Sequence, residues 1–565
     1  MKILLVGINA KYVHSNPAIY SLKSYAVKKS GNDERFKKNI DTLEFSINME
    51  KGDVIRKIYK EGADVVAFSC YLWNITYVYS IITALNSLVP ESDIWLGGPE
   101  VSFDPENQLK KYPMVRGILC GEGEAIFYNL AKEYIENGSG KALPQILRAE
   151  RLDFNEVPFL YDDLSIFDNR ILYYESSRGC PFNCSYCLSS VDKYIRLRDT
   201  KLVFAELNRF LEAKVKQVKF VDRTFNCNPS HTKDILEYIR DNDNGITNFH
   251  FEMAADIINE EEIRIMSSLR PGLIQIEVGI QTTNSDALKA INRQSDLKKL
   301  FENVRRILEP HNIHVHVDLI AGLPYEDIVS FRKSFNEVYS LHANELQLGF
   351  LKVLKGSLMA EEAARFGIKY LNEPPYEVLM TNWISYRDII ELKAVEEMVE
   401  IYYNSAQFVN TMLFLEKYFD DAYSLYKSIA DYFLQKGFDT IKLSRFERYE
   451  ILRDFALSCG KNIDEKKMTD VLLHDLYLRD NVKNRPSYGA GGEVEKNAYK
   501  DFFASGKYKE YLNNYEDYSP VQVSKMVHIE KSDEGYRLYD YRTKDPITGN
   551  ARNFMVQLGV NPNTL

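Results

Sequence analysis

Three cysteines within eight residues are the strongest chemical signal in this sequence of 565 residues. Cys180, Cys184 and Cys187 have the spacing Cys-x3-Cys-x2-Cys and follow directly after an apolar run at 171–175. Three thiolates on one short loop can bind three corners of a cubane iron–sulfur cluster and leave one iron open to an added ligand. A structural zinc site needs four ligands, and no fourth cysteine or histidine lies close by in the sequence. The spacing therefore predicts a 4Fe–4S cluster with one open iron. A degenerate zinc loop and three unrelated buried cysteines are the alternatives.

Composition limits the class of protein and its partners. Hydrophobic residues make up 45% and charged residues 27% of the chain, which is typical of a globular protein. The formal net charge of -10 disfavours a large nucleic acid as partner, but not a small phosphorylated molecule. The apolar start at 1–7 has no basic leader and is too short to span a membrane, so we expect a cytoplasmic protein with no membrane partner. The other cysteines, at positions 70, 120, 227 and 459, are scattered, and we expect them to be structural thiols.

The elements around the cysteine loop repeat a strand–helix pattern. Six apolar runs, each followed by helical periodicity, lie at 171–175, 218–221, 249–253, 274–279, 314–320 and 346–351. Such a series predicts a partial barrel of six βα units, with its active site at the carboxyl ends of the strands. Past residue 375 helical periodicity dominates, and the runs at 537–541 and 554–558 predict a terminal hairpin.

The N-terminal region shows a second α/β series. Apolar runs at 2–8, 65–69, 94–96 and 117–120 alternate with amphipathic stretches, which predicts a doubly wound parallel sheet of the flavodoxin-like type. Ligands of such sheets bind at the carboxyl ends of the strands. The predicted domains are a Rossmann- or flavodoxin-like domain at 1–145, a linker at 146–170, the partial TIM-type barrel at 171–370 and a mainly helical domain at 371–565 that caps the barrel.

At the cysteine triplet the sequence resembles the radical S-adenosylmethionine (SAM) superfamily, whose signature has an aromatic residue, here Tyr186, before the third cysteine. The resemblance implies that the open iron binds SAM, and that an electron from a donor such as flavodoxin or ferredoxin cleaves SAM to a 5′-deoxyadenosyl radical. Taken singly, Glu277 or Arg293 is also explained by a surface ion pair, and Gly322 by a turn. The residues that the resemblance implies for SAM binding are Tyr186, Asp222, Glu277, Gln281, Arg293, Ile320, Gly322 and Leu351.

A flavodoxin-like domain ahead of the barrel resembles the cobalamin-binding branch of this superfamily. Histidine-ligated cobalt has the signature Asp-x-His-x-x-Gly, but here Tyr12 and Pro17 stand at its Asp and Gly positions around His14. The carboxylate that would orient the imidazole is missing, so we expect His14 to cap local structure rather than bind cobalt. Cobalamin itself stays open, because the fold can be kept while the cofactor is lost. The possible substrate or cobalamin pocket comprises Asn9, His14, Ser69, Asn74, Gly97, Gly98, Glu100, Glu122, Lys352 and Lys355.

Over the whole chain the sequence resembles a subgroup that includes a queuosine lyase of anaerobic gut bacteria. This resemblance implies a radical SAM lyase that breaks a C–N bond in queuosine or queuosine 5′-phosphate and releases queuine. Lys352 and Lys355, just past the sixth predicted strand, are then candidates for a phosphate clamp. The alternatives are a cobalamin-dependent radical SAM methyltransferase and, from a different class, an iron–sulfur electron carrier or binding module.

Overall fold

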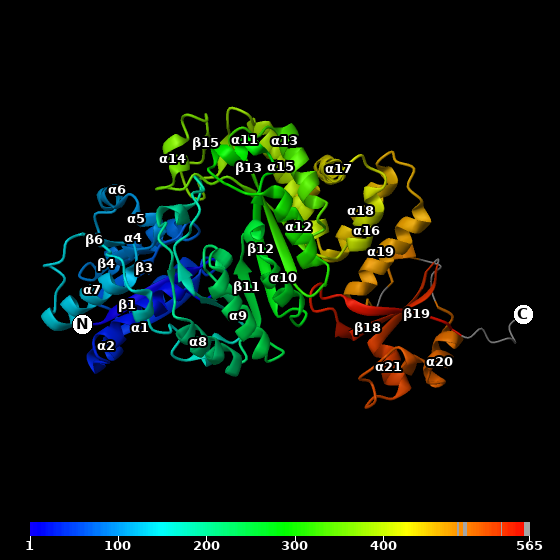
Figure 1. Ribbon diagram of the computed structural model, residues 1–565, viewed down its shortest axis with the longest axis horizontal. Helices are drawn as coiled ribbons and strands as arrows, with labels where there is room; N and C mark the ends of the chain where they lie inside the picture. Colours follow the sequence, from blue (N-terminus) through cyan, green and yellow to red (C-terminus); the bar gives the residue numbers. More distant parts are fainter. Residues whose placement is uncertain (483–484, 490–493, 533, 559–565) are drawn as a thin grey trace, which may run out of the picture. The chain divides into compact units, whose positions relative to one another are not determined.

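The computed structural model describes residues 1–482, 485–489, 494–532 and 534–558 (Figure 1). The chain divides into two compact units. The first comprises Met1–Ile313, Ile320–Asp327 and Phe350–Tyr386, and the second comprises His314–Leu319, Ile328–Gly349 and Arg387–Leu565. Every residue that the sequence predicts for a cluster, cofactor or substrate site belongs to the first unit. Within the part of the chain that the structure describes, every helix is too short or too polar to span a bilayer.

The N-terminal part of the first unit, blue to cyan in Figure 1, is built on a six-stranded parallel sheet with the order β2-β1-β3-β4-β5-β6. The strands are β1 (Ile3–Asn9), β2 (Ile40–Ser46), β3 (Val65–Ser69), β4 (Asp93–Gly97), β5 (Val115–Cys120) and β6 (Ile146–Arg148). The sequence did not predict β2, because only its ends are buried and its middle carries the polar residues Asp41 and Glu44. It also did not predict β6, which lies in the segment taken for a linker.

Side chains of this sheet alternate between two separate cores. Leu4, Val6 and Ile8 of β1 lie in one core, and Ile3 and Leu5 lie in the other, each together with residues of several helices. The helices of the first core include α3 (Lys51–Lys60) and α4 (Ile75–Leu88), and those of the second include α1 (Pro17–Lys29) and α7 (Gly123–Asn137). Because a strand's side chains point alternately to opposite faces, helices cover both faces, and the predicted doubly wound fold is confirmed.

The second sheet carries the barrel series, with the strand order β14-β13-β12-β11-β10-β7. Its strands are β7 (Ile171–Tyr174), β10 (Gln217–Phe220), β11 (Asn248–Glu252), β12 (Ile274–Gln281), β13 (His314–Ala321) and β14 (Glu345–Phe350). The pairs β7–β10, β10–β11 and β11–β12 are parallel. The helices that follow these strands include α8 (Thr200–Glu212), α9 (Pro229–Asp241), α10 (Glu260–Ser267), α12 (Leu297–Leu308) and α13 (Ile328–Tyr339). The six strand–helix repeats confirm the predicted partial TIM-type barrel.

The C-terminal part of the second unit is mainly helical, as predicted, and ends in a small sheet. Its helices include α16 (Val409–Glu416), α17 (Ala422–Lys436), α18 (Arg445–Ser458) and α19 (Glu465–Arg479). The predicted hairpin corresponds to β18 (Gly535–Lys544) and β19 (Ala551–Val556), and β17 (Val527–Ser532), which was not predicted, adds a third antiparallel strand. Asp475 of α19 is buried and accepts hydrogen bonds from the backbone and side chains of Asn410 and Thr411, so it ties α19 to the start of α16.

Candidate functional site

The three cysteines lie on a loop that two very short strands close at its base. β8 (Ser177–Arg178) and β9 (Arg196–Leu197) pair antiparallel on either side of this cluster loop, residues 179–195. Directly after β8, Gly179 has a φ of 93°, and a Cβ there would lie 2.4 Å from the carbonyl oxygen of Tyr194. Only glycine lets the chain turn there and pass so close to its own returning end.

The three thiols are free and close together. Cys180 and Cys184 are buried, and Cys187 is half-buried. Burial raises the pKa of the Cys180 thiol, and the nearby Cys187 and Cys184 add to this rise. Thiolates are the ligands of iron, so binding of a cluster includes loss of the thiol protons. The donor set therefore fits a 4Fe–4S cluster, which is the cofactor that the radical SAM chemistry requires together with SAM.

This arrangement differs from a site for a single metal ion. The described residues contain no group of three or more His, Cys, Asp or Glu side chains placed to hold one metal ion. A cubane cluster is held in another way, because each cysteine binds a separate iron.

Arg293 connects the cluster loop to the barrel sheet. Its Nη1 donates a hydrogen bond to Cys184 Sγ at 3.6 Å, and its Nη2 donates to the carbonyl oxygen of Gly279 in β12. A Cβ on Gly279 would lie 2.2 Å from Gln281 Nε2, so the Gln281 side chain folds back over this glycine. Tyr186 lies beside Arg293 and Cys184. Burial raises the pKa of its hydroxyl, and the nearby Arg293 and Cys184 also influence this pKa. The structure thus brings three of the residues predicted for SAM, namely Tyr186, Gln281 and Arg293, together beside a predicted cluster ligand.

Asp222, predicted for the amino group of SAM, is almost fully buried at 1% exposure. Its carboxylate accepts hydrogen bonds from Ser176 N at 2.9 Å, Ser176 Oγ at 2.7 Å and Ser177 Oγ at 2.6 Å. Burial raises its pKa to about 6, although these hydrogen bonds oppose the rise. In this structure Asp222 orders the residues just before the cluster loop, and a contact with SAM stays a prediction.

The other residues predicted for SAM lie on three neighbouring parts of the barrel. Glu277 on β12 lies 3.2 Å from Lys219 Nζ and 3.4 Å from His250 Nε2. Gly322, with a φ of 86°, follows β13, and a Cβ there would lie 2.6 Å from Val378 Cγ1. Ile320 is half-buried on β13, and Leu351 is buried after β14 with its N–H donating to the carbonyl of Ala321.

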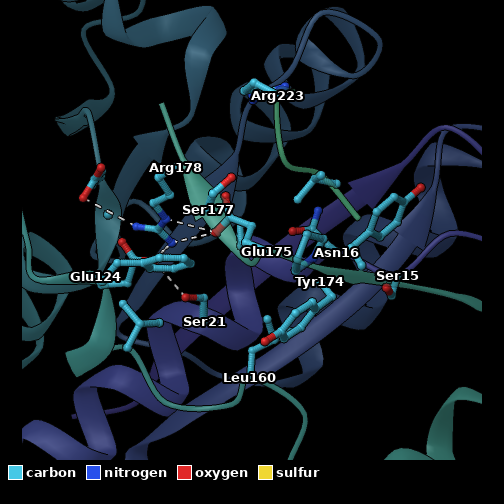
Figure 2. A pocket seen from close by; sticks show the side chains of 18 of the residues that line it. Ser15, Asn16, Ser21, Glu124, Leu160, Tyr174, Glu175, Ser177, Arg178 and Arg223 are labelled. Carbon is cyan, nitrogen blue, oxygen red and sulfur yellow. Dashed lines mark hydrogen bonds and ion pairs between the residues drawn. The ribbon is translucent and has the colours of Figure 1, made fainter. Parts of the chain in front are cut away.

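A cavity of about 640 Å³ lies at the carboxyl ends of strands from both sheets (Figure 2). It is lined after β1, β3 and β5 by Asn9, His14, Tyr71, Trp73, Glu122 and Glu124. From the barrel side it is lined at the end of β7, at the start of the cluster loop and after β10 by Tyr173, Tyr174, Glu175, Arg178, Gly179 and Arg223. Phe154, Val157, Phe159 and Leu160 add an apolar wall. Three residues predicted for a pocket, Asn9, His14 and Glu122, therefore share one cavity.

His14 is held by the barrel rather than by an acid of its own domain. Its Nδ1 and the Tyr173 hydroxyl lie 2.7 Å apart, and its carbonyl accepts hydrogen bonds from Asn9 Nδ2 and from Arg170. Burial lowers its pKa, as do Lys11, Lys219 and Arg170, so the imidazole is neutral near pH 7. Tyr173 thus occupies the hydrogen-bonding place of the missing Asp, a contact that no local sequence pattern indicates.

The remaining predicted pocket residues do not line this cavity. Asn74 donates to the carbonyls of Ile8 and Ser69, and its Oδ1 accepts from Tyr71 N, so it holds the loop after β3. Gly98, with a φ of 108°, lies next to Gly97, and a Cβ on it would lie 2.5 Å from the carbonyl oxygen of Cys70.

Lys355, a candidate for a phosphate clamp, is paired with an acid. Its Nζ lies 3.2 Å from Glu100 Oε1, and Glu100 also accepts a hydrogen bond from the Tyr376 hydroxyl. Lys352 is exposed and pairs through its backbone with Glu377.

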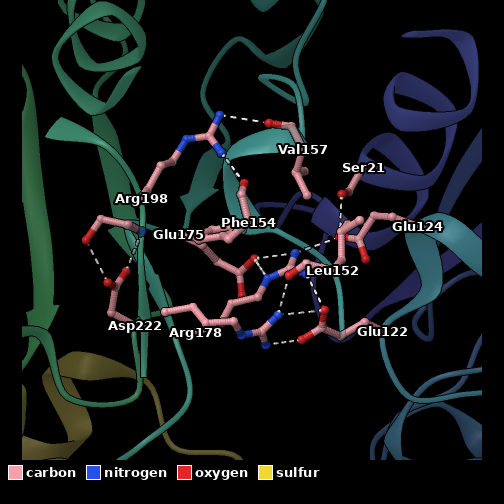
Figure 3. A network of polar contacts seen from close by, with 12 residues as sticks. Ser21, Glu122, Glu124, Leu152, Phe154, Val157, Glu175, Arg178, Arg198 and Asp222 are labelled. Atoms are coloured by element: carbon pink, nitrogen blue, oxygen red, sulfur yellow. Dashed lines mark hydrogen bonds and ion pairs between the residues drawn. The ribbon is translucent and has the colours of Figure 1, made fainter. Parts of the chain in front are cut away.

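Sequence reasoning missed the arginines that flank the cluster loop. Arg178 contacts Glu124 at 2.6 Å and Glu175 at 2.9 Å (Figure 3). Arg196 contacts Glu122. Their positions in the sequence could have indicated this role, because Arg178 comes just before the cysteine triplet and Arg196 comes directly after the cluster loop.

Comparison with family models divides the chain in the same order as the fold. Residues 3–131 match the B12 binding domain, and residues 174–338 match the radical SAM superfamily. Residues 364–545 match a family described as "Protein of unknown function (DUF4080)".

Similar proteins include the cobalamin-dependent radical SAM methyltransferase TokK of Streptomyces tokunonensis. It is 22% identical over 422 residues, which cover 66% of this chain and 61% of TokK. The chain therefore spans about three fifths of the length of the first curated relatives that it matches.

Solved structures share the fold. The radical S-adenosylmethionine methyltransferase TsrM from Kitasatospora setae, with cobalamin and a 4Fe–4S cluster bound, has a TM-score of 0.53 at 15% identity and covers 66% of this chain and 79% of its own. The cobalamin-dependent S-adenosylmethionine radical enzyme OxsB has a TM-score of 0.57 at 13% identity and covers 93% of this chain and 82% of its own. This chain thus carries a match to the B12 binding domain at residues 3–131, followed by a match to the radical SAM superfamily at residues 174–338.

Proposed function

We propose that this protein is a cobalamin-dependent radical SAM methyltransferase that acts on a small molecule. The observation that carries the proposal is the cavity, because its lining comes both from the B12-binding domain and from the start of the cluster loop. When bound, the cluster and SAM supply the radical chemistry and cobalamin supplies a methyl carrier. A cavity whose lining comes from the B12-binding domain and from the two ends of the cluster loop suits a transfer between the two cofactors, since the reacting groups must be held close together.

The cavity wall suits a large, flat ligand on the side of the B12-binding domain. The rings of Tyr71 and Trp73 stack with their centroids 4.4 Å apart and their planes 6° apart. Trp73 Nε1 donates to the carbonyl of Ile8, which fixes this ring pair at the carboxyl end of β1. Phe154 and Leu160 give the cavity an apolar wall, which suits a carbon radical because water promotes its side reactions.

The predicted lyase that breaks the C–N bond of queuosine is wrong. The relatives that bear on this chain, TokK and TsrM, are methyltransferases by name, and no comparison supports a queuosine lyase subgroup. The lyase prediction rested on a resemblance over the whole chain and on no residue that recognises a deazaguanine. Its phosphate clamp also lacks a free cation at Lys355, because Glu100 neutralises this side chain.

Cofactor loading and transfer of a labelled methyl group test the proposal. The protein is purified and reconstituted without oxygen, incubated with hydroxocobalamin, and analysed for iron and cobalt. We then expect close to one cobalt per chain and, with a strong reductant and methyl-labelled SAM, label in the cobalamin fraction. A protein with a complete cluster that cleaves SAM but binds no cobalamin would contradict the proposal.

Cys184→Ala is the matched variant for this experiment. The replaced thiol belongs to the cluster loop, whereas the stacked rings of Tyr71 and Trp73 lie in the B12-binding domain. We expect the variant to lose iron and SAM cleavage and to keep cobalamin binding. Loss of cobalamin together with the cluster would instead indicate that the variant is misfolded.

A further inference from the structure

Two arginines that face each other across the base of the cluster loop both reach one acid of the B12-binding domain. Arg178 on β8 and Arg196 on β9 are register partners, and each lies within ion-pair distance of Glu122, which follows β5. We propose that Glu122, Arg178 and Arg196 form a clamp, called here the Glu122 clamp, that fixes the cluster loop in the geometry that SAM binding needs. Glu122 of the B12-binding domain is then a positioning residue for SAM, the cofactor of the radical SAM domain.

Glu122 makes a bidentate contact with Arg196 and a single, longer contact with Arg178. Arg196 Nη1 donates to Glu122 Oε2 at 3.0 Å, and Arg196 Nη2 donates to Glu122 Oε1. Arg178 Nη1 lies 3.5 Å from Glu122 Oε2. The side chains of Arg178 and Arg196 are 13% and 11% exposed. A paired fork of this kind fixes both distance and orientation, and the low exposure of the two arginines reduces screening by salt.

A continuous series of contacts leads from the clamp to a cluster ligand. Arg196 Nη2 also contacts the Asp192 carboxylate at 3.2 Å, and the backbone carbonyl of Asp192 accepts the Cys180 N–H at 3.0 Å. Gly179, next to Cys180, is held against the carbonyl oxygen of Tyr194. A displacement of Arg196 is therefore passed to the backbone of Cys180 through one residue.

The cluster loop has little structure of its own with which to resist such a displacement. Its strands β8 and β9 contain two residues each, and the regular element between them is a single 3-10 turn at Leu188–Val191. Arg178 adds a second anchor, since it contacts Glu124 and Glu175 and lies 4.7 Å above the Phe154 ring. The position of the cluster loop relative to β12 thus depends on these contacts at its base, in addition to the Arg293 contact with Cys184.

SAM affinity tests the clamp without any need for cobalamin or a methyl acceptor. The SAM dissociation constant is measured on reconstituted full-length protein from the SAM-induced change in the EPR signal of the reduced cluster. We expect Glu122→Gln to weaken SAM binding about tenfold, within the range typical of coupling between sites. The matched control is Glu106→Gln, which removes an acid from an exposed ion pair with Arg148 in the same domain and should stay within about twofold of the wild type.

A conservative variant separates positioning from misfolding. Arg196→Lys keeps a positive charge beside Glu122 and Asp192, and we expect it to keep most of the SAM affinity, whereas Arg196→Glu places a third carboxylate there and should lose it. Iron content and thermal melting are measured on every variant. Wild-type SAM affinity in Glu122→Gln would overturn the clamp, as would an equal loss in Glu106→Gln. The clamp needs only the cluster and SAM, so a failure to bind cobalamin would count against the proposed function alone.

Discussion

The buried ion pair between Arg198 and Glu206 lies in the wall of the cavity. Its contacts allow the loss of folding stability on its removal to be predicted. The side chains are 4% and 9% exposed. Arg198 donates to the two carboxylate oxygens of Glu206 at 2.8 and 2.5 Å. It also donates to the backbone carbonyls of Phe154 and Val157, both at 2.8 Å. The Tyr174 hydroxyl also donates to Glu206 at 2.8 Å. This one guanidinium therefore ties the segment after β6 to the barrel.

We expect Arg198→Met to lower the free energy of unfolding of the first unit by about 3–5 kcal/mol. This is the cost of leaving one partner of a buried ion pair without the other. Of the donors to the Glu206 carboxylate described above, the Tyr174 hydroxyl remains, while the Val157 carbonyl loses the Arg198 donor and the Phe154 carbonyl keeps the Val157 N–H. Removal of both charges, on Arg198 and on Glu206, should lower the free energy of unfolding far less. We therefore expect Arg198→Met combined with Glu206→Leu and Tyr174→Phe to recover most of the stability.

Urea unfolding followed by tryptophan fluorescence measures this difference. All three tryptophans of the chain, Trp73, Trp95 and Trp383, lie in the first unit, so the signal reports on that unit. At common urea dependences the single variant should shift the midpoint by about 1 M or more. The reasoning is refuted if the single and the triple variant unfold at the same urea concentration, because the loss would then come from volume rather than from the unpaired charge.

Three further predictions address the ligands, the backbone and the titration of the site. Cys184→Ala should abolish cluster assembly, measured as iron per chain, whereas Cys459→Ala in the second unit should leave the iron content unchanged. Gly98→Ala should lower the thermal midpoint of unfolding, because its Cβ would lie 2.5 Å from the Cys70 carbonyl at a φ of 108°; an unchanged midpoint would contradict this close approach. Burial raises the pKa of Asp222 from 3.8 to about 6, so its contribution to stability is complete below about pH 4 and is lost as the pH rises through about 6, about 3 kcal/mol in all. Urea midpoints of the apoprotein at pH 4 and pH 7 should show this loss, and Asp222→Asn should reduce it.

The sequence predicted the strands of the barrel to within about two residues at each end, because buried apolar residues recur at every second position along most of them. Leu172, Val218 and Ile276 lie at such positions and are fully buried. The strand β2 was missed because Asp41 and Glu44 interrupt the apolar pattern, and only pairing with β1 shows that this segment is extended. Hydrophobic periodicity reports burial, so a strand with a half-exposed middle leaves a weak signal.

The sequence by itself determined the chemistry of the cluster. Cys180, Cys184 and Cys187 lie within eight residues, and their spacing brings the thiols onto one loop whatever the rest of the chain does. Only the tertiary structure decided which charged side chains contact that loop. Glu122 and Arg196 are 74 residues apart, and Arg198 is 44 residues from Phe154. Short spacings are fixed by covalent geometry, whereas the partners of a buried charge are fixed by how strands and helices pack, and no local pattern contains that information.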